Sequence, residues 1–367
     1  MTFTQATLSK TVKGFLNTLV LTSFLIPGMG LAADGCMSQI VSAISSLGNA
    51  LKVVFKHCER IQCPNCSQWW ISKRAFKLAV LVECYALYTK TRPAGVVASI
   101  HPEAVKSWTW TDYGKFIRTC YSRMLKLGVT GGVRVFHPFR VKDDVKHDLR
   151  ALGAKDSGGF WKMIRENVLK LPSWYSYVYL APHIHSIVFP SFIEENSKKD
   201  IIVKKYAVFD SVKDTVAHLR YLLSHCGLLT DGEIEPASPF GALHGWKPED
   251  HLTHEQILSV KGAVADAMGL QYDEAADDIK PVDTEDELKY DWVAIHEFAD
   301  YSNEQHQFIG AFVSGITNKA HRSFVDGVIS LYNERRNDTG LTKDKRQVFL
   351  DDLVDIPEGF EVVVVDR

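Results

Sequence analysis

The chain has 367 residues and a mass of 41.3 kDa, and 46% of its residues are hydrophobic and 11% aromatic. This composition excludes a largely disordered protein. The net charge of -2 conceals a division, because residues 1–230 contain 30 Lys and Arg against 15 Asp and Glu, whereas residues 231–367 contain 12 against 29. A basic half is typical of proteins that bind a polyanion, although uneven charge also occurs in globular proteins without such a partner.

The N-terminal segment is apolar. Residues 14–33 carry no charge and follow two lysines, which is typical of a signal sequence or a single membrane span. Pro27 and Gly28 oppose insertion as a continuous apolar helix. We therefore expect a structural apolar helix within residues 1–35, with a membrane tether or a cleaved signal as the alternative.

The next part of the chain is predicted to be helical. Residues 36–56 have apolar side chains at helical spacing, and residues 68–88 form a strongly amphipathic helical pattern. A further helix is expected over residues 112–127. Together these segments predict a helical region over residues 36–128.

Seven cysteines in a chain of this length favour metal binding or reduced thiols over a disulfide framework. Cys58, Cys63 and Cys66 follow the spacing C-x4-C-P-x-C, which is typical of a structural zinc knuckle. Only one CxxC pair is present, so reduced thiols without a metal are the alternative. The candidates for a fourth zinc ligand are His57, Cys36, Cys84 and His101.

The centre of the chain has an α+β pattern. A strand is predicted over residues 131–141, a helix near 160–169 and one or two strands over 174–189. The last of these contains the sequence PHIHSIVF. Because alternate residues of a strand point to the same face, His183 and His185 project together.

Two imidazoles on one sheet face are half of a divalent-metal site. His137, in the sequence HPFR, can face the same site if its strand pairs beside the first two histidines. The alternative is that these are unrelated strand histidines. Which of the two holds depends on the tertiary fold.

A helix over residues 212–226 contains Tyr221 and His225, which are four apart and so share a helix face. A tyrosine that attacks a phosphodiester needs a rigid element, a nearby metal and a group that accepts its proton. An ordinary amphipathic tyrosine is the alternative interpretation.

Residues 231–367 are acidic. They contain predicted helices near residues 253–268 and 319–336, followed by a C-terminal strand in FEVVVVD. The sequence has no GxxxxGK[ST] phosphate loop, so a P-loop ATPase or helicase is not expected. We expect four regions: an apolar helix at 1–35, a helical zinc-knuckle region at 36–128, a central α+β domain at 129–230 and an acidic accessory region at 231–367.

The order of these motifs along the chain resembles that of a known protein family. A CPxC knuckle followed by two tryptophans, then HPFR, PHIHSIVF, RYLLSHCG and GALHGW, resembles the rolling-circle replication initiators of archaeal plasmids and viruses, members of the HUH endonuclease superfamily. The resemblance covers roughly residues 58–245. It implies a ferredoxin-like or RRM-like antiparallel sheet with helices on one face. The widespread YxxK motif of the family is altered here, because Ser224 takes the fourth position and His225 follows, so Tyr206 is a second candidate for the tyrosine.

The resemblance also implies a reaction. His183 and His185 would bind Mg²⁺ or Mn²⁺, with His137 as a third ligand, and Tyr221 would attack origin DNA with His225 beside it. Basic residues of the first half are expected to contact the DNA, and the ones we single out are Arg134, Arg140 and Arg220.

The expected partners are single-stranded or cruciform origin DNA and a host polymerase and helicase, in the cytoplasm unless residues 14–33 tether the chain to a membrane. Three alternatives remain. The first is a zinc-knuckle regulator that binds DNA without catalysis. The second is a transposase or relaxase of the same superfamily. The third is a membrane-tethered structural or secretion-associated protein.

Overall fold

The structure is a computed structural model. It describes residues 24–30, 32–100, 113–155, 157–168, 174–190, 196–197, 201–229, 235–282, 289–298, 312–338, 347–353 and 356–365. The chain forms two compact units, one of Met1–Ala32 with Glu59–Ile279 and one of Ala33–Cys58 with Lys280–Arg367. These units differ from the four regions expected from the sequence, because each unit combines segments that are far apart in the chain.

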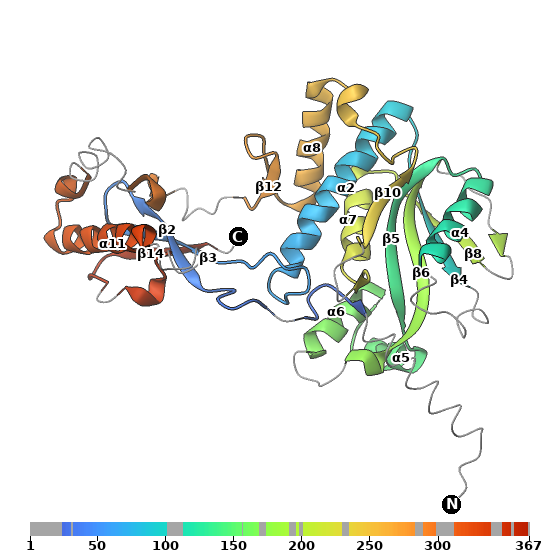
Figure 1. The fold of residues 1–367 in the computed structure, drawn as a ribbon, viewed down its shortest axis with the longest axis horizontal. Helices are drawn as coiled ribbons and strands as arrows, with labels where there is room; N and C mark the ends of the chain where they lie inside the picture. The colour runs from blue at the N-terminus through green and yellow to red at the C-terminus, as the bar shows by residue number, and fades with distance from the viewer. Residues whose placement is uncertain are drawn as a thin grey trace, which may run out of the picture. The chain divides into compact units, whose positions relative to one another are not determined.

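The first unit is built on a six-stranded sheet (Figure 1) with the order β10-β5-β6-β4-β8-β7. All neighbouring strands are antiparallel. The α+β class is therefore confirmed. The strands are β4 (Ala94–Ile100), β5 (Gly131–Val141), β6 (Val178–Phe189), β7 (Asn196–Ser197), β8 (Ile201–Val208) and β10 (Ala237–Gly241).

Apolar side chains lie on both faces of this sheet, and helices cover both faces (Figure 1). On one face, Phe136 and Ile184 share a core with the buried side chains of α4 (Tyr113–Lys126). On the other face, Val133 and Ile187 share a core with α2, α7 and α8. The bounds of these three helices are Ser67–Thr89, Val212–Leu223 and His254–Met268.

The expectation of helices on one face alone is therefore wrong. The physical reason is that β5 and β6 carry buried apolar side chains on both faces. Each face therefore needs a layer of side chains packed over it. Two further helices, α5 (Asp143–Ala151) and α6 (Ser157–Val168), follow β5. They contribute Leu149, Trp161 and Ile164 to the first of the two cores.

The described part of the N-terminal apolar segment is not helical. β1 (Phe24–Leu25) pairs with β9 (Leu228–Leu229), and a turn with Gly28 at a φ of 81° follows. Ile26 is fully buried, so this segment is held by the core of the first unit. Residues 14–23 lie outside the described residues. Among the described helices, none is both long and apolar enough to cross a membrane.

The second unit contains a four-stranded sheet with the order β13-β2-β3-β14. Its strands are β13 (Trp292–Ala294), β2 (Gln39–Ser45), β3 (Ala50–Phe55) and β14 (Glu361–Val365). β2 and β3 form an antiparallel hairpin, and β14 pairs in parallel with β3. The helix α11 (Lys319–Asn337) packs Val325, Val328 and Ile329 against this sheet.

The prediction of a helix over residues 36–56 is therefore wrong. The segment is rich in β-branched residues, and Gly48, at a φ of 63°, permits the turn between its two halves. The helices predicted near residues 68–88, 112–127, 160–169, 212–226, 253–268 and 319–336 are confirmed as α2, α4, α6, α7, α8 and α11. The remaining named elements are the β11–β12 hairpin (Gln271–Asp273, Asp278–Lys280) and short 3-10 helices at Trp174–Tyr177, Pro248–Asp250, Ile295–Phe298 and Leu350–Asp352.

Candidate active site and candidate zinc site

Three histidines meet on one face of the large sheet. The register of β5 and β6 pairs His137 directly with His183, and His185 lies two residues further along β6. One ring nitrogen from each of the three side chains lies within 4.8 Å of those of the other two. The ring centroids are 4.9–5.2 Å apart. The condition for His137 to face the histidine pair, that its strand pairs beside theirs, is thus met.

The hydrogen bonding of these rings suits metal binding. His183 Nδ1 lies 2.6 Å from the carbonyl oxygen of Ala181, and a bond donated there leaves Nε2 with its lone pair for a cation. His137 is fully buried, and neither of its ring nitrogens has a hydrogen-bond partner among the described residues. A buried polar atom without a partner costs on the order of 1–3 kcal/mol. A divalent metal ion in this cluster would satisfy one of these nitrogens.

The electrostatics of the cluster keep the rings neutral. Burial lowers the pKa of His183 to about 3, and the nearby charge of Arg140 acts in the same direction. Burial, together with the other histidines, also holds the pKa values of His137 and His185 well below the ordinary value. Since an imidazole must be neutral to bind a metal, all three are suited to be ligands at neutral pH.

A cavity of about 340 Å³ opens beside the histidines. It is lined by Val97, Phe139, Arg140, Val141, Lys146, Phe160, Trp161, His183, His185, Tyr206, Tyr221 and His225. The two tyrosines that were candidates for the nucleophile are therefore both present, one from β8 and one from α7. The cavity also holds two positive charges and no carboxylate among the described residues that line it.

Tyr221 and His225 lie together, although only the first is helical. α7 begins with a capping box between Ser211 and Asp214 and ends at Leu223, so His225 lies in the turn that follows. Their ring centroids are 4.7 Å apart. His225 also stacks on Trp161 at 5.0 Å and lies edge-on to His137 at 4.3 Å, which fixes its ring at the side of the histidine cluster.

Tyr206 makes a different set of contacts. Its hydroxyl is hydrogen-bonded to His218 Nε2 and lies 3.4 Å from His185 Nδ1. Burial raises the pKa of Tyr206 and lowers that of His218 to about 4. Sequence reasoning missed His218 and Trp161. The signal for His218 was its position three residues before Tyr221 on the same helix.

The three arginines expected at the DNA do not lie together. Arg140 lines the cavity and donates a hydrogen bond of 2.9 Å to Ser99 Oγ. Arg134 points to the opposite face of the sheet, where it donates to the hydroxyl of Tyr113. Arg220 is exposed on α7 and is not among the residues that line the cavity. Only Arg140 is thus placed to act at the histidine site.

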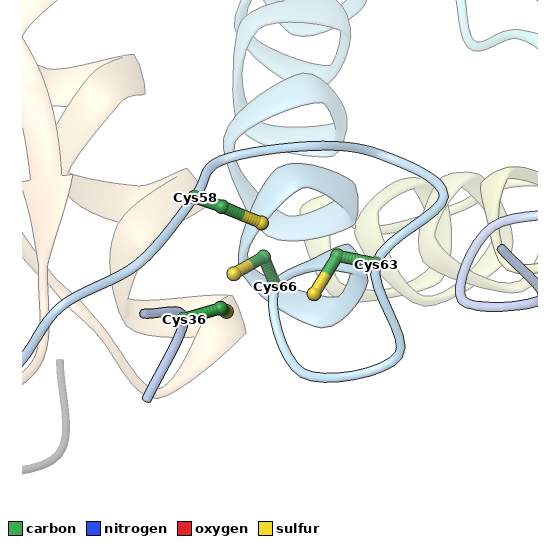
Figure 2. Close-up of side chains that lie close together, drawn as sticks. All are labelled: Cys36, Cys58, Cys63 and Cys66. Carbon is green, nitrogen blue, oxygen red and sulfur yellow. The ribbon is translucent and has the colours of Figure 1, made fainter. Parts of the chain in front are cut away.

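Four cysteines form a second cluster (Figure 2). Cys58, Cys63 and Cys66 are joined by Cys36, and their sulfur atoms lie within 4.8 Å of one another. Cys36 is therefore the fourth candidate ligand that this fold brings to the knuckle. Cys84 instead lies in the core around α2, where burial raises its pKa to about 12, and His101 lies outside the described residues. Four thiols in one cluster are a donor set that fits structural zinc.

The histidine site has the parts that phosphoryl transfer needs: a position for a divalent cation, two phenols and a guanidinium on one cavity. The cysteine site has donors for a metal but lies outside the residues of that cavity. Comparisons of the chain with protein-family models, with curated proteins and with solved structures found no match.

Proposed function

We propose that the protein is a metal-dependent DNA-nicking and joining enzyme of the rolling-circle initiator type. The observation that carries this proposal is the meeting of His137, His183 and His185 on one sheet face beside Tyr221. The sheet supports it as well. Its four central strands have the spatial order β8-β4-β6-β5, which is 4-1-3-2 when these strands are numbered along the chain, as in ferredoxin-like sheets.

The substrate is a DNA strand whose scissile phosphate enters the histidine cavity. A Mg²⁺ or Mn²⁺ ion held by the three histidines would offset negative charge on the non-bridging oxygens of that phosphate. Arg140, at the edge of the same cavity, supplies a second positive charge for the phosphate.

Tyr221 acts as the nucleophile. Its oxygen forms a bond to phosphorus while the bond from phosphorus to the 3′-oxygen breaks, which leaves a 5′-phosphotyrosine and a 3′-hydroxyl. His225, whose ring lies beside the phenol, accepts the phenolic proton, and the departing 3′-oxygen takes a proton from water. The covalent bond conserves the energy of the phosphodiester, so attack of a 3′-hydroxyl on the phosphotyrosine rejoins the strand without ATP.

Tyr206 has a positioning role in this proposal. Its hydroxyl accepts from His185 Nδ1 and donates to His218 Nε2, which keeps the other nitrogen of His185 for the metal. Groups that orient a metal-binding histidine in this way typically change metal affinity by about 10- to 100-fold when they are removed. The two tyrosines can therefore be told apart by experiment.

The test is covalent capture of DNA. A pool of random single-stranded 40-mers, labelled at the 3′ end, is incubated with the protein and Mn²⁺, and SDS-resistant adducts are isolated and mapped by mass spectrometry. Wild-type protein is expected to carry the label on Tyr221. Tyr221→Phe is expected to lower adduct formation by at least about 10³-fold, since the nucleophilic oxygen is lost.

Two further variants complete this test. Tyr206→Phe is expected to form the adduct but to need about tenfold more Mn²⁺. Tyr121→Phe, on the opposite face of the sheet, is the matched control and should behave as wild type. An adduct on Tyr206 would exchange the two roles, and the absence of any adduct with wild-type protein would refute the proposed function.

A further inference from the structure

A second cavity, of about 430 Å³, lies next to the histidine cavity. Val97 and Arg140 line both, so the two cavities are contiguous. The residues of the second cavity that matter here are Val97, Ser99, Arg140, Tyr179, Ile202 and Lys204. Its volume lies within the range of roughly 300–1,000 Å³ that is usual for small-molecule sites.

The strand register explains why this cavity opens on the histidine face. In β4, Val97 pairs with His185 and Ser99 pairs with His183. In β8, Lys204 pairs with Val97 and Ile202 pairs with Ser99. Because directly paired residues of antiparallel strands project to the same side, the histidine face continues across β4 onto β8 as the floor of this cavity.

The lining combines apolar surface, an aromatic ring and positive charge. Val97 and Ile202 give an apolar floor, and Tyr179 is 42% exposed at the side. Arg140 is held in place by its hydrogen bond to Ser99, and Lys204 is exposed on the opposite side of the floor. No carboxylate is among the described residues that line this cavity.

We propose that this cavity binds one unstacked base of single-stranded DNA beside the phosphate that Tyr221 attacks. The base lies on Val97 and Ile202 and stacks on Tyr179, while Arg140 and Lys204 contact the flanking phosphates. This inference rests on the proposed function for the identity of the strand. It assigns to the cavity the base preference of the enzyme at one position next to the cleaved bond.

The test separates the contribution of the bases from that of the phosphates. Binding of fluorescein-labelled dT15 is compared with binding of a fully abasic 15-mer of the same charge, by fluorescence anisotropy without added Mg²⁺ or Mn²⁺. Wild-type protein is expected to prefer dT15. Ile202→Trp fills the cavity from β8, so the ratio of the two affinities should fall by about fivefold while affinity for the abasic strand is unchanged.

A lysine pair supplies a matched control. Lys204→Gln should weaken binding of both strands and lower the slope of log affinity against log salt by about 0.7, the value for one phosphate contact in a single strand. Lys205→Gln, whose side chain projects to the other face, should change neither quantity. Equal effects of the two lysine variants would place the strand elsewhere and overturn the proposal.

Two further combinations of results decide whether the base pocket exists. If Ile202→Trp and Tyr179→Ala both keep the wild-type preference for dT15, the base pocket is refuted, even where wild-type protein still forms the covalent adduct. If the adduct is absent but both variants lose the preference, the pocket stands and the nicking function fails. Circular dichroism checks folding, and Tyr179→Ala, at an exposed position, replaces Ile202→Trp if that variant does not fold. Tighter binding of rU15 than of dT15 would overturn the assignment to DNA.

Discussion

The chain contains two clusters of metal-binding side chains that differ in donors and in access. The histidine cluster presents imidazole nitrogens beside a cavity, whereas the cysteine cluster presents four sulfur atoms and, among the residues that the structure describes, no other grouped donor. Catalytic metal sites keep a position for substrate, and structural sites are closed by four protein ligands. By these criteria the histidine cluster has the donors and access expected of a catalytic site, and the cysteine cluster has the donors expected of a structural one.

The two clusters also differ in backbone support. The histidines are held by the hydrogen-bonded register of β5 and β6 in the middle of a sheet, which fixes their spacing before any metal binds. Three of the four cysteines lie in the short segment that leads into α2, and Cys36 lies in a turn before β2. We therefore expect metal removal to abolish the reaction at the first site and to lower stability at the second.

The largest expected effect comes from the histidine ligands. His183→Ala removes a ligand at the centre of the cluster, so the rate of adduct formation with Mn²⁺ should fall by at least about 10³-fold, while affinity for single-stranded DNA changes by less than about threefold. The rate is measured by denaturing electrophoresis and the affinity by anisotropy. His147→Ala, at a side chain that is 87% exposed on α5, is the control. Full activity in His183→Ala would remove the metal role from this cluster.

The cysteine cluster should show the opposite pattern. Cys66→Ser is expected to remove about one zinc ion per chain and to lower the free energy of unfolding by roughly 3 kcal/mol or more, since zinc binding is coupled to folding. Metal content is measured by mass spectrometry and stability by denaturant titration. Cys84→Ala, in the core of α2, is the matched control and should lose stability without losing zinc. Equal zinc content in wild type, Cys66→Ser and Cys84→Ala would contradict the zinc assignment.

Much of the histidine site could be predicted from the sequence because its rules are local. The two-residue period of a strand places His183 and His185 on one face, and the C-x4-C-P-x-C spacing brings three sulfurs together within one segment. The strand of His137 was also predicted over residues 131–141, with the bounds it has in the structure. What remained open was which strands are neighbours, and that is decided by the packing of the whole sheet.

The predictions that were wrong also depended on how distant segments of the chain pack together. Residues 36–56 have helical spacing and also strand-forming composition, and pairing of β3 with the distant β14 favours the strand. Arg134 was expected at the DNA, but its parity on β5 sends it to the α4 face, opposite to His137. Cys36 reaches the cysteine cluster only through contacts between segments far apart in sequence, which no local pattern encodes. His218 shares a helix with Tyr221, but its hydrogen bond to Tyr206 on β8 could not be predicted from the helix alone.

The smallest expected effect is a change with pH in the free energy of unfolding, and it distinguishes the histidine cluster from the cysteine cluster. His183 has a pKa of about 3 in the folded protein, below the ordinary value of 6.5, because burial and Arg140 disfavour its charged form. Between these two values the unfolded chain binds more protons than the folded chain, so the free energy of unfolding must fall as the pH is lowered from 6.5 towards 3. From pH 7 to 5 this one side chain lowers the free energy of unfolding by about 2 kcal/mol. Urea titrations at pH 7 and 5, without added Mg²⁺ or Mn²⁺, should therefore show a smaller loss for His183→Asn than for wild type, whereas the exposed His147→Asn should match wild type. If the cysteines hold zinc, its release in acid would affect wild type and both variants alike, so the difference between the proteins isolates the histidine site. An identical loss in all three would show that His183 is not held neutral by burial.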